Sequence, residues 1–361
     1  MITGHGDDAY QYEDIRMDFS SNIYGHADLS DLKEHLRQHL DLIDHYPEPE
    51  AVTLEREIAA RRGVPPACVM VTNGATDAIY LIAQSLSLSF RHEPMSLPSQ
   101  GEGKQTEAHG RFRFEVRQPT FSEYEDACRM YGAHSGLGMM EEKQGSDARL
   151  HTALWLCNPN NPTGEVLPRE EVLRLASSYG LLILDQSYED YTDAPLLTPV
   201  EVIRNRRIIQ IFSMTKANAV PGLRIGYVIA PAEMISHLRT YLRPWSVNAL
   251  AIEAGLWLIR HDAKAIPDKT SYLAEAQRLR HELAALLGIE VHPTATNFML
   301  CRIAGHTASE LKRHLAEECH ILIRDASNFA GLDDHYFRIA AQTQKEDDAL
   351  IRAIQKFISS C

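Results

Sequence analysis

Apolar residues recur at helical spacing near the start of the chain. From Leu29 to Ile43 they fall at every third or fourth position, which predicts an amphipathic helix with one buried face. Two prolines in the segment DHYPEPE end the pattern. A second helix is predicted from Thr53 to Arg62, with Gly63 as its stop signal.

From Cys68 onward the pattern alternates between strands and helices. The runs VMVT, ALWLC, LLILD and RIIQIF are largely apolar, as is typical of strands buried on both faces. Helical patterns begin near Thr76, Ser122 and Pro168. This alternation predicts an α/β fold with a mainly parallel central sheet and helices on both faces. In such sheets the functional groups gather at the carboxyl ends of the strands.

Beyond Pro231 long helical patterns are followed by short strands. Helices are expected at about 232–242, 248–260, 272–287 and 345–358, with strands in FMLCRI, HILIR and YFRIA. This texture predicts a second, smaller α+β lobe. We therefore expect residues 1–44 to pack with the small lobe, 45–240 to form the large lobe and 241–361 to form the small one.

Composition excludes several classes of protein. The 361 residues carry a net charge of -13, and acidic residues are spread along the chain, whereas a nucleic-acid-binding protein would present a basic face. No apolar run is long enough to span a bilayer. The start of the chain is polar and acidic and does not resemble a signal peptide, so the cytoplasm is the expected location.

Two further features carry no predicted chemistry. The six cysteines are scattered without the spacing of a zinc site or a redox dithiol, and no metal site is predicted. The segment 91–111 is polar and rich in Pro, Gly, Ser and Glu. We interpret it as a surface loop outside the catalytic site.

Two turns after predicted strands are candidates for ligand binding. In TNGATDA the residues Gly74, Ala75 and Thr76 open a helix, whose free backbone amides can hold a phosphate. The loop CNPNNPTG, from Cys157 to Gly164, combines prolines with asparagines, and its amide side chains can point at a polar ring. Each pattern also occurs in purely structural turns.

An aspartate and a lysine follow the next two strands. Asp185 ends the run LLILD, where a carboxylate is costly unless it is paired; a protonated pyridine nitrogen would be such a partner, and capping of the next helix is the alternative. Tyr188 is close enough in sequence to bond a ring hydroxyl. Lys216 lies between Ser213 and Arg224, so its amine could form an imine while the hydroxyl and guanidinium hold a phosphate.

The order of these features along the chain resembles the fold-type I pyridoxal-phosphate enzymes of the class I/II aminotransferase group, over nearly the full length. That resemblance implies a pyridoxal 5'-phosphate cofactor, with Lys216 bonded to it and Asp185 paired with its ring nitrogen. It further implies contacts to the ring from three residues: Asn161 and Tyr188 at the 3-oxygen, and Phe121 stacked on the ring.

The same resemblance implies a site shared between two chains. Tyr46 matches a tyrosine that reaches the cofactor phosphate of the neighbouring subunit, so a homodimer is expected. Arg338 matches the arginine that binds a substrate α-carboxylate. No nucleic-acid or membrane partner is implied.

Two branches of the group compete on the sequence: decarboxylases of L-threonine O-3-phosphate in the cobalamin pathway, and histidinol-phosphate aminotransferases that use 2-oxoglutarate and glutamate. GHGDD, DFSSNI and IRDASNF are closer to the decarboxylase pattern, although Asp7 departs from it. The resemblance makes His5, Asn22 and Arg324 candidates for the substrate phosphate. A non-catalytic ligand-binding protein of the same fold is a remote alternative, because such proteins are expected to lose Lys216 or Asp185.

Overall fold

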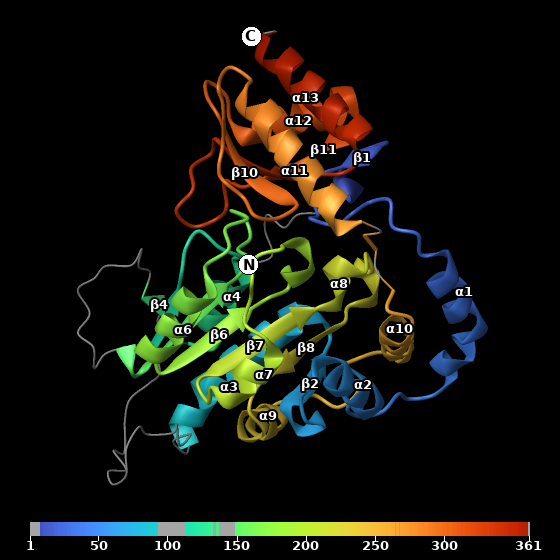
Figure 1. Ribbon diagram of the computed structural model, residues 1–361, viewed down its shortest axis with the longest axis vertical. Coiled ribbons are helices and arrows are strands. Elements are labelled where there is room, and N and C mark those ends of the chain that lie inside the picture. The colour runs from blue at the N-terminus through green and yellow to red at the C-terminus, as the bar shows by residue number, and fades with distance from the viewer. Residues whose placement is uncertain are drawn as a thin grey trace.

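The computed structural model describes residues 8–92, 113–132, 135–136, 149–263, 265–266 and 268–359. The described chain forms a larger lobe around a seven-stranded sheet and a smaller lobe that carries the C-terminal helices (Figure 1). His5 and nearly all of the polar segment 91–111 lie outside the described residues.

The large sheet has the strand order β2-β8-β7-β6-β5-β3-β4. Neighbouring strands are parallel except around β8, which runs antiparallel to β2 and β7. The predicted mainly parallel sheet is thus confirmed, whereas β8, with the run GYVI, was not predicted. The strands are β2 (Val69–Thr72), β3 (Arg113–Val116), β4 (Ser135–Gly136), β5 (Thr152–Cys157), β6 (Leu181–Asp185), β7 (Ile208–Ser213) and β8 (Gly226–Ile229).

Helices cover both faces of this sheet, as predicted. Ala153 and Trp155 of β5 belong to the core beneath α3, α4 and α9, whereas Leu154 and Leu156 belong to the core beneath α6 and α7. Because alternate side chains are buried on opposite faces, the strand must be apolar throughout. These helices are α3 (Gly74–His92), α4 (Glu123–Met130), α6 (Arg169–Ser178), α7 (Pro199–Arg204) and α9 (Ala232–Arg239).

The first predicted helix is shorter than its apolar spacing suggested. Helix α1 (Ser30–Gln38) is followed by the 3₁₀ turn η2 (Leu40–Asp44). Leu32 is buried, but Leu40 and Ile43 are 47% and 66% exposed. The expectation of one continuous buried face was therefore wrong for the second half of the segment.

Helix α2 (Val52–Arg62) ends as predicted, since Gly63 adopts the left-handed φ of 68° that favours glycine. It shares a core with α10 (Ala249–Arg260), including Leu54 and Ile58. Helix α10 thus packs with the larger lobe, although it falls within the range 241–361 that the sequence suggested for the small one. The division into lobes stays a prediction.

In the described part of the chain, the small lobe combines two sheets with three helices. β1 (Met17–Asp18) pairs in parallel with β11 (Ile321–Leu322), which brings the start of the described chain against the C-terminal part. The antiparallel sheet has the order β12-β13-β10-β9. Its strands are β9 (Ile289–Val291), β10 (Phe298–Ile303), β12 (Arg324–Asp325) and β13 (Tyr336–Ala340), and the helices are α11 (Lys269–Ala284), α12 (Ala308–Cys319) and α13 (Gln344–Ser359).

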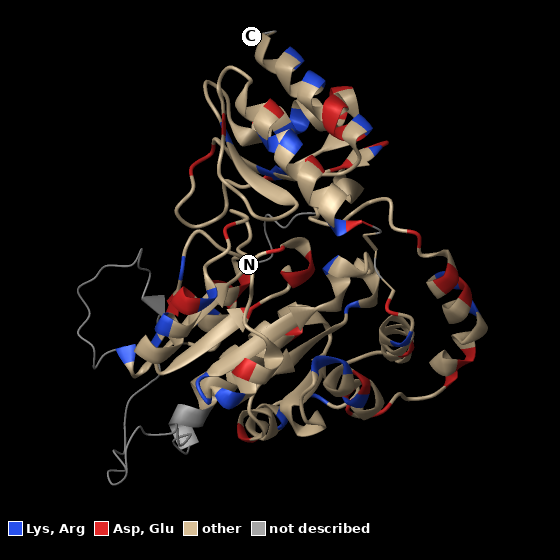
Figure 2. Ribbon diagram, in the orientation of Figure 1, with Lys and Arg blue, Asp and Glu red and all other residues tan. Residues whose placement is uncertain are grey.

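Short helical turns occupy several connections. The elements are α8 (Met214–Ala217), η1 (Ala9–Gln11), η3 (Pro66–Cys68), η4 (Glu189–Tyr191) and η5 (Pro221–Leu223). Acidic and basic residues are interspersed over the helices in the view of Figure 2, and the central strands carry few of either. Within the described residues no helix is both long and apolar enough to cross a membrane.

Candidate active site

A cavity of about 320 Å³ lies at the carboxyl ends of β5, β6 and β7. Residues from both lobes line it, together with the segment around Ser20 and Ser21. Ten of the residues singled out from the sequence line this cavity: Ala75, Thr76, Phe121, Asn161, Asp185, Tyr188, Ser213, Lys216, Arg224 and Arg338.

Asp185 is the buried carboxylate of the cavity. It is 3% exposed, and its two oxygens accept hydrogen bonds from the Tyr124 hydroxyl and the Ser187 backbone N–H, both at 2.8 Å. Burial raises the pKa of Asp185, and these donors only partly oppose that effect. A cationic partner in the cavity would relieve the cost of the buried charge.

Tyr124 was missed by the sequence reasoning. It lies on α4, with its ring stacked 5.4 Å from that of Trp155 and edge-on to Phe121 at 5.8 Å. Burial raises the pKa of Tyr124 well above its ordinary value, so the hydroxyl stays a donor to Asp185. An aromatic residue on an amphipathic helix looks like ordinary core, and nothing in its sequence context distinguishes it.

Lys216 lies on the single turn α8, directly after β7. The Ser213 hydroxyl accepts the Thr215 N–H at 3.2 Å and caps this turn, while the Tyr191 hydroxyl donates to the Lys216 carbonyl at 2.7 Å. These contacts fix the backbone of the lysine. Its Nζ donates to the Ser21 carbonyl at 3.1 Å, inside the cavity.

The part of the cavity lined by the start of α3 and by Arg224 suits an anion. Gly74, at the start of α3, has a φ of 84°, and a Cβ there would lie 2.9 Å from Nη2 of Arg224. The glycine therefore lets the guanidinium approach the free amides at the helix start. Close by, the buried Thr215 hydroxyl has no partner within the described residues. Helix amides, a guanidinium and an unsatisfied hydroxyl match the acceptor oxygens of a phosphate.

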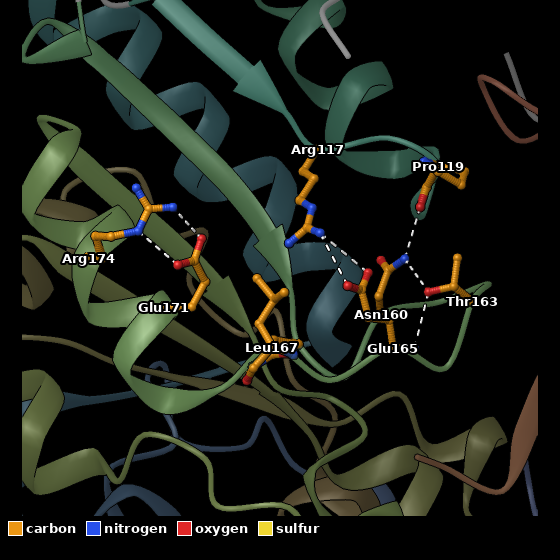
Figure 3. Close-up of polar contacts among 9 residues, drawn as sticks. Arg117, Pro119, Asn160, Thr163, Glu165, Leu167, Glu171 and Arg174 are labelled. Atoms are coloured by element: carbon orange, nitrogen blue, oxygen red, sulfur yellow. Dashed lines mark hydrogen bonds and ion pairs between the residues drawn. The ribbon is translucent and has the colours of Figure 1, made fainter. Parts of the chain in front are cut away.

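The asparagine loop after β5 divides its amides between two tasks. Asn160 donates to the Pro119 carbonyl and the Thr163 hydroxyl, both at 2.9 Å, as Figure 3 shows. Asn158 exchanges two hydrogen bonds with the backbone of Leu167. Only Asn161 of these asparagines lines the cavity. The expectation that the loop's amides in general point at a ligand was thus too broad.

Tyr188 and Asn22 form one buried pair. Nδ2 of Asn22 donates to the Tyr188 hydroxyl at 3.3 Å, and burial raises the pKa of Tyr188 to about 12. The phenol therefore keeps its proton for an acceptor in the cavity. Asn22 itself does not line the cavity and is fully buried in the left-handed conformation, with φ 57°.

Two arginines lie opposite each other at the small-lobe end. Arg324 of β12 pairs directly with Arg338 of β13. Arg338 lines the cavity and donates to Oδ1 of Asn161 and the Ser20 carbonyl. Burial lowers the pKa of Arg338 to about 10, and the Arg324 charge contributes to that shift. Arg324 does not line the cavity; it donates to Oδ1 of Asn328 at 2.7 Å.

Tyr46 lies away from the cavity of its own chain. Its side chain is 84% exposed, and its ring is 5.3 Å from that of Trp245.

This fold and this cavity define a class of protein, and comparison with known proteins agrees. The chain belongs to the family "Aminotransferase class I and II", which it matches over residues 14–354. Members of this class are enzymes that use pyridoxal 5'-phosphate. The chain is accordingly a pyridoxal-phosphate-dependent enzyme with the fold-type I architecture expected from its sequence.

Proteins of two activities are among its similar relatives. The crystal structure of L-threonine-O-3-phosphate decarboxylase from Porphyromonas gingivalis is 36% identical, with a TM-score of 0.83, and covers 95% of this chain and 100% of that one. Threonine-phosphate decarboxylase of Salmonella typhimurium is 28% identical over 96% of this chain and 92% of its own length. Histidinol-phosphate aminotransferase of Caldanaerobacter subterraneus is 26% identical over 88% of this chain and 85% of its own.

The residues of the cavity fit this cofactor. Among the described residues, only hydrogen bonds from Ser187 and Tyr124 oppose the burial cost of Asp185, and the Thr215 hydroxyl has no partner there. The glycine at 74 leaves room for the Arg224 guanidinium. A pyridinium nitrogen and a phosphate would satisfy these groups.

Proposed function

We propose that this enzyme decarboxylates L-threonine O-3-phosphate. The observation that carries the proposal is the direct pairing of Arg324 with Arg338, one of which reaches the cavity. The register places their Cα atoms opposite each other, both side chains are buried, and the Arg324 charge contributes to the lowered pKa of Arg338. Asp8, Asp18 and Asp325 offset part of this positive charge. A substrate with both a carboxylate and a phosphate would add two further anionic groups to it. The likeness to the decarboxylase of Porphyromonas gingivalis, at 36% identity, supports the same choice.

In this proposal the large lobe holds the cofactor. Lys216 is the residue bonded to it, Asp185 pairs with its ring nitrogen, and Asn161 and Tyr188 contact its ring oxygen. Phe121 lies against the ring. The phosphate is held by three residues at the start of α3, Gly74, Ala75 and Thr76, together with Ser213 and Arg224.

The small lobe orients the substrate. When bound, pyridoxal phosphate supplies a ring that accepts the electrons of a broken bond at the substrate Cα. Arg338 would hold the carboxylate in a two-point contact, and Arg324 and Asn22 would lie toward the substrate phosphate. His5 belongs to the same proposed set, although it lies outside the described residues. In this proposal the freed amine of Lys216 would return a proton to Cα.

Transamination of histidinol phosphate is the second candidate. The relatives at 26% identity over 88% of the chain favour it, and the same lysine could remove the Cα proton instead of returning one. The difference lies in which bond at Cα the two arginines hold perpendicular to the ring.

We also propose that the enzyme is a homodimer in which Tyr46 reaches the partner's cofactor phosphate. Its 84% exposure and the exposure of Leu40 and Ile43 in the same region support an uncovered interface. Sedimentation should give the mass of a dimer. Tyr46→Phe should weaken cofactor binding and leave the dimer intact. A monomer with full activity would contradict both statements.

The reaction is tested by offering two substrates to the purified enzyme. Threonine phosphate should release carbon dioxide without any keto acid, whereas histidinol phosphate with 2-oxoglutarate should yield no glutamate. Lys216→Ala serves as the inactive control. Glutamate formation without carbon dioxide release would decide for the aminotransferase.

A further inference from the structure

Three potential metal ligands meet where α1 packs against α10. His35 lies in the last turn of α1, His39 follows as the residue that ends it, and Glu253 comes from α10. Nε2 of His35 is 2.7 Å from Oε1 of Glu253, and the two imidazole rings are 4.1 Å apart. One potential ligand atom from each residue lies within 4.8 Å of the others.

The hydrogen bond of His39 fixes a tautomer suited to metal binding. Its Nδ1 lies 2.8 Å from the His35 carbonyl. Because a carbonyl only accepts, Nδ1 must carry the proton, which leaves the lone pair on Nε2. Imidazoles that bind metals commonly donate their other N–H in this way, since the bond holds the ring in place.

We propose that His35, His39 and Glu253 form a binding site for a transition-metal ion of the Zn²⁺ type. Two imidazoles and one carboxylate are a common zinc ligand set, with a fourth position left for water. Tetrahedral coordination at about 2.0–2.2 Å needs ligand atoms roughly 3.3–3.6 Å apart. The ligand atoms, which lie within 4.8 Å of one another, would have to approach by at most about 1.5 Å to meet this geometry. The ion takes the place of the proton between His35 and Glu253.

The surroundings allow an ion to enter from solvent. The side chains of His35 and Glu253 are 23% and 22% exposed, which leaves room for a water ligand. None of the three residues lines the cavity of the candidate active site. The metal site is therefore independent of the proposed function, and its test does not depend on which reaction the enzyme catalyses.

Other histidine clusters of the described chain are weaker candidates. Asp333, Asp334 and His335 also lie close together, but both acids are exposed and only one imidazole is present. Nε2 of His26 lies 2.6 Å from Oε2 of Glu346, but among the described residues this pair belongs to no group of three potential metal ligands. His26 therefore provides a matched control, a half-exposed histidine–glutamate pair that lacks the second imidazole.

The consequence of metal binding would be mechanical. The ion would join α1 to α10, which itself packs on α2. Helices α1 and α2 flank, along the chain, the segment that contains Tyr46. An ion bound only in the folded state raises the midpoint of thermal unfolding as its concentration rises above the dissociation constant.

Titration of the full-length, tag-free holoenzyme with Zn²⁺, after treatment with a chelator, tests the site. Calorimetry should show saturable binding of one ion per chain, and Co²⁺ at the same site should give the intense visible bands of low coordination number. His39→Asn and Glu253→Gln should each weaken Zn²⁺ binding at least about tenfold, since even outer partners of a ligand contribute 10–100-fold. His26→Asn should bind as the wild type does.

The proposal is overturned if no saturable binding occurs, if both site variants bind Zn²⁺ as tightly as the wild type, or if His26→Asn loses binding equally. Circular dichroism and the metal-free unfolding midpoint establish that each variant is folded. Two variants on different helices keep the test decisive if one of them fails to fold.

Discussion

Replacing Asp185 with asparagine is expected to stabilise the cofactor-free protein while inactivating the enzyme. The carboxylate is 3% exposed, and burial raises its pKa. The substitution removes the charge and keeps both hydrogen bonds. The new Oδ1 accepts from the Ser187 N–H, and the new Nδ2 donates to the Tyr124 hydroxyl, which can rotate to accept.

The size of the effect follows from the cost of an incompletely satisfied buried group, about 1–3 kcal/mol. An unfolding entropy of about 2.1 cal/mol/K per residue gives roughly 0.76 kcal/mol/K for the 361 residues. The midpoint of thermal unfolding should therefore rise by about 1–4 °C. Turnover should fall on the order of 10²–10³-fold, because the variant cannot balance a charged ring nitrogen.

The stability gain should depend on pH in one direction. A group whose folded pKa is raised favours folding below its unfolded value and loses that contribution as the pH rises through the folded value. The gain from Asp185→Asn should thus be absent near pH 3.8, the ordinary value, and grow as the pH rises. Calorimetry of the cofactor-free proteins over a pH series measures it. A variant that is less stable than the wild type at neutral pH would refute the reasoning and make Asp185 a structural residue.

Three further substitutions test other parts of the site. Lys216→Ala should abolish the yellow colour of the holoenzyme, and a variant that keeps the wild-type visible spectrum would remove the lysine from its role. Tyr124→Phe withdraws a donor worth about 1.5–3 kcal/mol from the charged form of Asp185, so the acid limb of the pH–rate profile should move to higher pH; an unmoved limb would contradict this. Gly164→Ala places a Cβ 2.0 Å from Oγ1 of Thr294 at a φ of +72°. The free energy of unfolding, measured in urea, should fall by about 1–3 kcal/mol. Wild-type stability would show that Thr294 moves aside at no cost.

The sequence predicted those parts of the site that follow strands. Asp185 and Lys216 each come directly after a largely apolar run, so both were expected at one edge of a parallel sheet, and both line the same cavity. Two-sided burial forces such strands to be apolar, so their ends can be located from the sequence.

The sequence could not predict partners that chain folding alone brings together. Leu40 and Ile43 have helical spacing, but spacing does not reveal whether another element covers them, and here they are exposed. Asn158 and Asn161 are chemically identical, yet one bonds the backbone of its own loop and the other faces the cavity. Glu253 reaches His35 across 218 positions of sequence, beyond any local motif.

Residues 20–22 join the two ends of the site and act largely through their backbone. The residue types at these positions therefore did not predict their role. The Ser20 carbonyl accepts from Arg338 and the Ser21 carbonyl accepts from Lys216, while the next residue, Asn22, donates to Tyr188. Any residue offers a carbonyl, so no pattern of side chains marks these positions. Both carbonyls are acceptors beside groups that, under the proposed function, bind a substrate carboxylate and the cofactor. A ligand bound to Arg338 or Lys216 would therefore either share that group with this segment or displace the segment's carbonyl from it. The backbone conformation of residues 20–22 is thus part of the binding energetics at both ends of the cavity.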